Sequence, residues 1–491
     1  MAVAAAFTMI VIAPTGAAAT VATCPVPPGT TGVTDVGCAG MFELDGNIPH
    51  DSLTTPPWDW AKDATGHGGV MNNDGSAVSN GITGAIVNSG VIADYAQPDN
   101  SYFQQNKDIE NSSAWGCVSQ SQPTPKDDLL NAYAVVFEPA SGPRAGHRIL
   151  YVASERQQNN GNAYAGFWLL QNPTSCSPTA NGGSFQTSGH STGDFLLLAN
   201  YTNGGSVAGL SVLRWDPTAP NNLAGVATST DCRDVNSTAD ICGRVNSAPE
   251  TPPWPNSSGT PASLPEPTGD FLEIGIDMTA LGLDHTAGGQ TLCSSSFLAE
   301  SRSSQEATAT LKDYASGAFD ICRRPTATTS VDGNGTTSVK PGASVFDSAT
   351  LSGASPTASG TVTYNLYAGS ACTGTPVFSS TKTVTNGLVP NSDPWTATVG
   401  SYQWQATYSG DLASGGIDQP TSSTCGAEPL TVIAPTVVPT PSPSPVTVVQ
   451  AATVTPAKTG DWTILMVLGA PLLLIGFLLL VMSRRRREVE A

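Results

Sequence analysis

Short apolar and aromatic runs recur along the first part of the chain, and clusters of Gly, Asn, Pro and Ser separate them. Runs of this length, rich in β-branched and aromatic residues and bounded by turn residues, are typical of β-strands. Helical periodicity is nearly absent, and PKDDLLNAYA (125–134) is the one segment that suggests a short helix. The clearest strand predictions are AYAVVFEP (132–139), HRILYVASE (147–155), AYAGFWLLQ (163–171), DFLLLANYT (194–202), LSVLRWD (210–216) and FLEIGIDM (271–278).

This density of strands predicts an all-β domain over residues 24–324, with a jelly-roll-like β-sandwich as its architecture. The Pro-rich stretch at 249–269 is expected to run over the surface between two of the strands.

Residues 325–433 show a cleaner pattern, in which apolar and polar positions alternate with a period of two. The alternation is visible in SGTVTYNLY (359–367), PVFSSTKTVT (376–385) and GSYQWQATYSG (400–410). The third strand would place one set of side chains in a core, namely Tyr402, Trp404, Ala406 and Tyr408. The length and strand spacing predict a small immunoglobulin-like sandwich.

Segment 400–411, GSYQWQATYSGD, resembles the penultimate strand of the bacterial Ig-like repeats found on actinobacterial surface proteins. That resemblance implies a spacer or adhesive module rather than an enzyme. A second resemblance covers residues 41–322, through FELDGN, WDW, KDIENSSAW, PKDDLLNAYA, ERQQNNGNAYAGFW and GDFLLLANYTNGG. These features look like the N-terminal domain of a group of large bacterial surface proteins, and they imply a fold and a location but no activity.

Ten cysteines are present, an even number, and none form a C-x-x-C pair. With five histidines in the chain, a zinc site is not expected, and an exported chain of this kind favours disulfides. Neighbours along the sequence suggest the pairs Cys24–Cys38, Cys117–Cys176, Cys232–Cys242, Cys293–Cys322 and Cys372–Cys425, with other connectivities open.

The formal net charge is −19, although only 12% of residues are charged. An acidic surface repels nucleic-acid phosphates and anionic lipid, so we expect no nucleic-acid partner.

Both ends of the chain indicate export. Residues 1–23 are interpreted as a signal peptide, with Ala17-Ala18-Ala19 offering a cleavage site; a lipoprotein signal ending at Cys24 is the alternative. Residues 434–455 form a Pro/Ser/Thr-rich linker that favours polyproline II and can reach on the order of 70 Å.

An apolar segment at 462–482 is long enough to cross a bilayer as the single transmembrane helix of the chain. The basic tail that follows predicts a cytoplasmic C-terminus and an extracellular body; its arginines are Arg484, Arg485, Arg486 and Arg487. We expect the protein at the cell surface, in the cell wall or in the plasma membrane.

The stretch just before this segment, within 456–491, resembles the sorting signal of Gram-positive proteins that sortase attaches to peptidoglycan. That signal reads L-P-x-T-G, or L-A-x-T-G in an actinobacterial variant, and this chain has Pro456, Ala457, Lys458, Thr459 and Gly460. Pro456 stands where the family has Leu. The resemblance implies cleavage between Thr459 and Gly460, with sortase and peptidoglycan as partners; a protein held permanently by 462–482 is the alternative.

Two further patterns have ordinary structural explanations. GHSTG (189–193) is a literal G-x-S-x-G, but the residues after it predict a strand where a nucleophile elbow requires a helix, so a hairpin turn is expected. Oxygen-rich loops could hold a structural Ca²⁺ or could be plain turns. They are ELDGN (43–47), NNDG (72–75), NKDIE (106–110), PKDD (125–128) and SERQQNNGNA (154–163).

Several aromatic residues are expected in the core, with a sugar-binding face as the alternative: Trp58, Trp60, Trp115, Phe167 and Trp168. Taken together, the sequence predicts a non-catalytic, adhesin-like or structural surface protein whose glycan or protein ligand, if it has one, is unknown. The competing hypothesis is a surface-anchored carbohydrate-active enzyme or carbohydrate-binding protein, for which paired carboxylates would be needed.

Overall fold

The computed structural model describes residues 35–52, 54–79, 81–94, 101–119, 123–202, 206–229, 239–254 and 267–434. These ranges form strands and short 3-10 turns and contain no α-helix, which confirms the all-β prediction. They belong to one compact unit that ends at Ala434. No helix among them has the length and apolar character to cross a membrane, and the predicted span at 462–482 lies outside the described residues.

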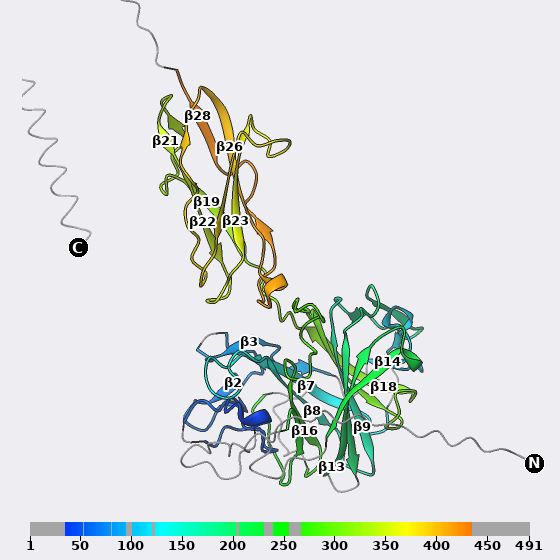
Figure 1. Ribbon diagram of the computed structural model, residues 1–491. Coiled ribbons are helices and arrows are strands. Elements are labelled where there is room, and N and C mark those ends of the chain that lie inside the picture. Colours follow the sequence, from blue (N-terminus) through cyan, green and yellow to red (C-terminus); the bar gives the residue numbers. More distant parts are fainter. Residues whose placement is uncertain are drawn as a thin grey trace, which may run out of the picture. The chain divides into compact units, whose positions relative to one another are not determined.

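Two antiparallel sheets build the N-terminal body, the name used here for the described residues 35–322 (Figure 1, blue to green). The ten-stranded sheet runs β10 (Ser175–Cys176), β11 (Gly183–Gln186), β6 (Gly116–Val118), β5 (Tyr102–Phe103), β18 (Leu311–Ala318), β17 (Ser296–Arg302), β9 (Ala163–Leu170), β12 (Phe195–Thr202), β13 (Ser206–Trp215) and β14 (Leu223–Ser229). The six-stranded sheet runs β15 (Ile241–Val245), β16 (Phe271–Asp277), β8 (Ile149–Arg156), β7 (Leu129–Phe137) and β3 (Ala85–Asn88), with β4 (Ile92–Ala93) also on β7.

Both faces of each sheet are covered, which explains why the long strands read as continuous apolar runs. In β9, Phe167 belongs to the core between the sheets, whereas Trp168 belongs to a second core on the outer face of the ten-stranded sheet. In β8, Leu150 faces the first of these cores, and Tyr151 joins a third core on the outer face of the six-stranded sheet. The sandwich is therefore flanked by loop segments that bury their own aromatic residues against it.

All six strands predicted for this body are present. The suggested helix at 125–134 is wrong: residues 125–127 form a turn, and β7 begins at Leu129. The segment forms a strand because its residues pair with β8 from Leu129 to Phe137 and bury apolar side chains on both faces. These tertiary contacts outweigh the local helix propensity.

The C-terminal body comprises residues 326–434 (Figure 1, yellow-green to orange). Its largest sheet runs β20 (Ser338–Val339), β28 (Pro429–Val432), β26 (Gly400–Tyr408), β23 (Thr361–Ala368) and β24 (Phe378–Thr383), with β27 (Thr421–Ser422) also on β26. Two further pairs are β19 (Thr326–Val331) with β22 (Asp347–Ser352), and β21 (Ser344–Val345) with β25 (Trp395–Thr396). The three predicted strands are confirmed as β23, β24 and β26.

The predicted face of β26 is the core face. Trp404, Ala406 and Tyr408 are fully buried there, and Tyr402 is nearly so. Their alternation with polar neighbours reproduces the period of two seen in the sequence.

Three disulfides agree with the predicted pairs, namely Cys117–Cys176, Cys293–Cys322 and Cys372–Cys425. The pair predicted for Cys24 and Cys38 and the partner predicted for Cys242 involve residues outside the described ranges, although Cys242 is itself disulfide-bonded. Cys425 lies on the surface of the C-terminal body, so this bridge fastens loops instead of joining two strands across the core.

Candidate functional site

One loop of the N-terminal body leaves regular pairing and gathers carboxylates. Residues 43–48 bulge between two parallel bridges, Phe42 with Trp58 and Pro49 with Ala61. Gly46 has a φ of 86° in this bulge, a conformation that glycine adopts without strain. A Cβ on Gly46 would lie 2.9 Å from the Val245 carbonyl oxygen, so the loop packs closely on β15.

Glu43, Asp45 and Asp51 each place a carboxylate oxygen within 4.8 Å of the others. In the described part of the chain they are the one group of this kind. The buried Glu43 accepts from the backbone amides of Asp51 (3.0 Å) and Ser52 (3.0 Å), and His50 Nδ1 lies 3.1 Å from its Oε2. Asp45 is half-buried and Asp51 is exposed, so the trio runs from the interior to the surface.

Two more carboxylates, both fully buried, lie behind this trio. Asp59, the first residue of β1 (Asp59–Ala61), accepts from the Trp60 amide through Oδ1 at 2.6 Å, while its Oδ2 has no hydrogen-bond partner. Glu273 of β16 accepts from Trp60 Nε1 at 3.0 Å and from the Gly46 amide at 2.5 Å. The charges that act most strongly on Asp59 are those of Asp45, Glu273 and Glu43.

Burial dominates the electrostatics of this group. It raises the pKa of Asp45 to about 7, with Asp51 and Glu43 adding to the rise and Arg244 opposing it. Burial also holds the pKa values of Asp59 and Glu273 well above the ordinary range. Without a compensating cation, the folded protein therefore favours protonated forms of these acids.

The other oxygen-rich loops named from the sequence do not assemble such a group among the described residues. Asp74, in 72–75, is exposed and accepts from Ser76 within its own turn. Asp108, in 106–110, is buried and pairs with Arg302 at 2.7 Å. In 125–128, Asp127 accepts from Thr124 at 2.6 Å.

The G-x-S-x-G segment is a loop between β11 and β12, but the two strands do not pair with each other, so the predicted hairpin turn is wrong. Ser191 accepts a hydrogen bond from an asparagine, and a strand follows it rather than a helix. The His190 side chain is fully buried and stacks on Trp215 with ring centroids 4.3 Å apart, and its Nδ1 lies 3.2 Å from Asp194 Oδ2. This histidine therefore packs in the aromatic core and does not activate the serine.

The aromatic residues proposed as core are largely so. Trp60, Trp115, Phe167 and Trp168 are at most 1% exposed, and Trp58 is half-buried. An aromatic platform for stacking sugars requires exposed rings, and these four do not supply one.

An open cavity of about 400 Å³ lies between residues 77–88 and Arg323. Ala, Val, Ile, Ser, Gly and Asn residues form the rest of its lining, and none of the described residues around it is acidic. The cavity therefore lacks the carboxylate pair that glycoside hydrolysis needs.

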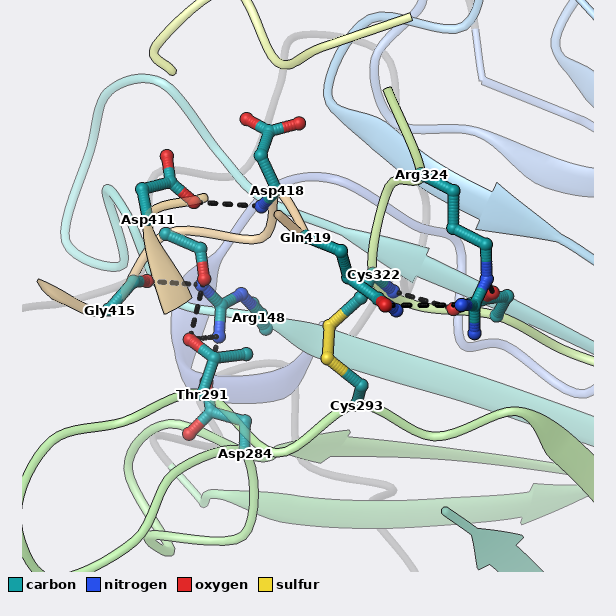
Figure 2. Close-up of a disulfide and its surroundings, with 12 residues drawn as sticks. Arg148, Asp284, Thr291, Cys293, Cys322, Arg324, Asp411, Gly415, Asp418 and Gln419 are labelled. Atoms are coloured by element: carbon teal, nitrogen blue, oxygen red, sulfur yellow. Dashed lines mark hydrogen bonds and ion pairs between the residues drawn. A yellow bond between two sulfur atoms is a disulfide. The ribbon is translucent and has the colours of Figure 1, made fainter. Parts of the chain in front are cut away.

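A polar junction joins the two bodies within the compact unit (Figure 2). The Arg148 guanidinium donates to the Gly415 carbonyl oxygen at 2.6 Å and to Asp284 Oδ2 at 3.3 Å. Arg323 forms a parallel bridge with Asp418, and its amide donates to the Ile417 carbonyl oxygen at 2.7 Å. Segment 411–419 of the C-terminal body is thereby fixed beside the Cys293–Cys322 disulfide.

A buried acid pair in the C-terminal body gives a pH prediction. Burial, and next the charge of Glu428, raises the pKa of Asp347 from 3.8 to about 8, and burial also raises the pKa of Glu428. A raised carboxyl pKa favours the folded state at low pH and loses that contribution as pH rises toward the folded value. We expect the free energy of unfolding of this body to fall by about 2 kcal/mol between pH 4 and pH 8, because water reaching the ionised pair limits the penalty.

Urea unfolding of the unit that ends at Ala434, measured across this range, tests the expectation. Asp347→Asn should flatten the pH dependence. Asp393→Asn is the matched control, because Asp393 is exposed and hydrogen bonds, chiefly from Lys382, lower its pKa, so it titrates below the window. An unchanged slope in Asp347→Asn would contradict the assignment.

The sorting-motif residues 456–460, the arginines 484–487 and the signal peptide lie outside the described residues. No family model matches the chain, and no curated protein matches it.

Proposed function

We propose that this chain is an exported, non-catalytic surface protein, adhesin-like or structural, displayed outside the cell by its C-terminal segment. The observation that carries the proposal is the set of three disulfides, distributed over both β bodies. Disulfides of this kind form and persist in oxidising compartments, which agrees with the export signals read from the sequence.

Within this proposal, the N-terminal body is a jelly-roll-like sandwich and the C-terminal body an Ig-like spacer. Antiparallel pairing between the long strands of two packed sheets supports the first assignment. A small antiparallel body with a buried Trp404 at the centre of its core supports the second. The junction contacts of Arg148 and Arg323 suit a spacer that holds its neighbour in place.

A surface-anchored carbohydrate-active enzyme or carbohydrate-binding protein is the competing function. The burial of the aromatic residues and the lack of acidic residues around the described cavity both weigh against it. A hydrolase screen on the unit that ends at Ala434 distinguishes the two. Turnover that a single Asp or Glu substitution abolishes would establish the enzyme.

For display, we propose transpeptidation by sortase. The peptide bond between Thr459 and Gly460 breaks, a thioester on the sortase cysteine holds the Thr459 acyl group, and an amine of peptidoglycan then takes it over. The linker at 434–455 would carry the body through the cell wall.

The C-terminal mass of protein released by muralytic digestion tests this mechanism. The expected product ends at Thr459 and carries a peptidoglycan fragment. Thr459→Ala should keep the apolar segment and remain in the membrane fraction. If the wild-type protein is recovered with residues 462–491 intact, the protein is instead held permanently by its membrane segment.

A further inference from the structure

We propose that loop 43–51, which contains the bulge at 43–48 and lies beside Asp59, binds one calcium ion that fixes this loop to the N-terminal body. The ligands are carboxylate oxygens of Glu43, Asp45 and Asp51. The inference goes beyond the proposed function and does not depend on how the chain is anchored.

The first argument is the balance of charge. Glu43, Asp59 and Glu273 are 0% exposed, and Asp45 and Asp51 adjoin them. Arg244 of β15 acts on Asp45 and Glu273, and His50 adjoins Glu43. Buried carboxylates are normally paired with cations or coordinate a metal, and a bound cation would compensate the charge that the five acids gather here.

The second argument is independent of the acidic trio. Asp59 is completely buried, and its Oδ2 accepts no hydrogen bond. The charges acting most strongly on it are those of Asp45, Glu273 and Glu43, so Asp59 lies beside the trio. The buried Oδ1 of Asn47, in the same bulge, also accepts no hydrogen bond. Orphaned buried acceptors are rare in folded proteins, and a cation held by the trio would offset the charge of Asp59 beside it.

The donor chemistry selects calcium. All candidate ligands are oxygens, which hard cations prefer, and the nearby His50 is engaged with Glu43. Calcium–oxygen distances of about 2.3–2.6 Å place opposite ligands about 4.6–5.2 Å apart. The carboxylate oxygens of the trio lie within 4.8 Å of one another, so one calcium ion can contact all three. Magnesium, at about 2.0–2.1 Å, requires a tighter and more regular set of ligands than a bulged loop with an exposed Asp51 offers.

Calcium at this position would join three parts of the fold. Loop 43–51 supplies the trio, Asp59 of β1 lies beside it, and the Gly46 amide already connects the loop to Glu273 of β16. Ligand binding to the folded state alone raises stability as calcium is added. The layer that covers the outer face of the six-stranded sheet should therefore become more stable against unfolding.

The test uses the full-length chain in detergent, stripped with chelator and titrated with CaCl₂ by isothermal calorimetry. We expect one ion per chain, with affinity in the micromolar-to-millimolar range, and a rise in melting temperature with calcium. Asp51→Asn should weaken binding about tenfold or more while keeping the fold, because Asp51 is exposed. Asp45→Asn should do the same.

Asp74→Asn is the matched control, since Asp74 belongs to another oxygen-rich loop and is exposed. It should bind calcium as the wild type does. Absence of heat and of a melting shift up to about 10 mM CaCl₂ would overturn the proposal, as would equal binding by wild type and Asp51→Asn. Equal affinity for MgCl₂ would overturn the assignment to calcium.

Discussion

Replacing Arg302 with leucine is expected to lower the free energy of unfolding of the N-terminal body by about 3–5 kcal/mol. Arg302 ends β17, is 1% exposed and forms ion pairs with Asp108 at 2.7 Å and Glu300 at 3.5 Å. Its guanidinium also donates to the carbonyl oxygens of Ser304 and Glu306. Leucine fills part of the space but leaves two fully buried carboxylates without their cation.

The pH dependence of this loss is a further readout. Burial, and next the charge of Asp108, already raises the pKa of Glu300, and Arg302 opposes that rise. Removing the arginine should raise the pKa of Glu300 further, so Arg302→Leu should be least destabilised in acid and most at neutral pH. Calorimetry of the unit that ends at Ala434, across a pH series, measures this.

Arg324→Leu is the matched control for that experiment. Arg324 pairs with Asp320 at 2.7 Å, but its side chain is 62% exposed, and exposed ion pairs contribute little. The change should cost less than about 1 kcal/mol. Wild-type stability in Arg302→Leu at neutral pH would show that the buried network does not hold the outer core together.

Trp404→Ala is expected to destabilise the C-terminal body by about 3–5 kcal/mol. The indole is fully buried in β26 and meets Phe378 edge-on, with centroids 5.8 Å apart. Its Nε1 has no hydrogen-bond partner, so the ring contributes through packing alone. Trp404→Phe should therefore cost much less than alanine, because most of the packed ring remains.

Urea unfolding followed by circular dichroism measures both variants. Val399→Ala is the control, since Val399 is 60% exposed and should change stability by less than about 0.5 kcal/mol. A loss as large in Trp404→Phe as in Trp404→Ala would mean that the indole nitrogen, and not ring packing, holds the strand.

Much of the fold could be predicted because each long strand is a short apolar run between turn residues. β8, β9 and β12 lie almost where the sequence places them. The start of β7 could not be predicted, because the proline and two aspartates ahead of Leu129 are also typical of a helix N-terminus. Its pairing with β8 is set by residues further along the chain, and a local pattern does not contain that information.

The candidate cation site could be predicted only in part. Segment 43–47 is visibly rich in oxygen-bearing side chains, so this loop could be predicted as a candidate calcium site. Asp59 and Glu273 gave no such signal, since each lies in an apolar stretch that reads as a strand or its edge. Glu273 meets Gly46 across a sequence separation of 227, and such proximity arises only once the sheets form.

The Cys293–Cys322 disulfide has a mechanical consequence if the protein is pulled from its C-terminal side. Load that reaches Cys322 passes directly to Cys293 through the sulfur bridge, which encloses a sequence separation of 29. β17 and β18 lie inside this covalent loop and bear no end-to-end tension. β17 pairs with β9 in the interior of the ten-stranded sheet. Because tension from the C-terminal side reaches neither end of β17, it cannot separate β17 from β9 by pulling on β17. The enclosed residues add nothing to the extension released on unfolding while the bridge is intact.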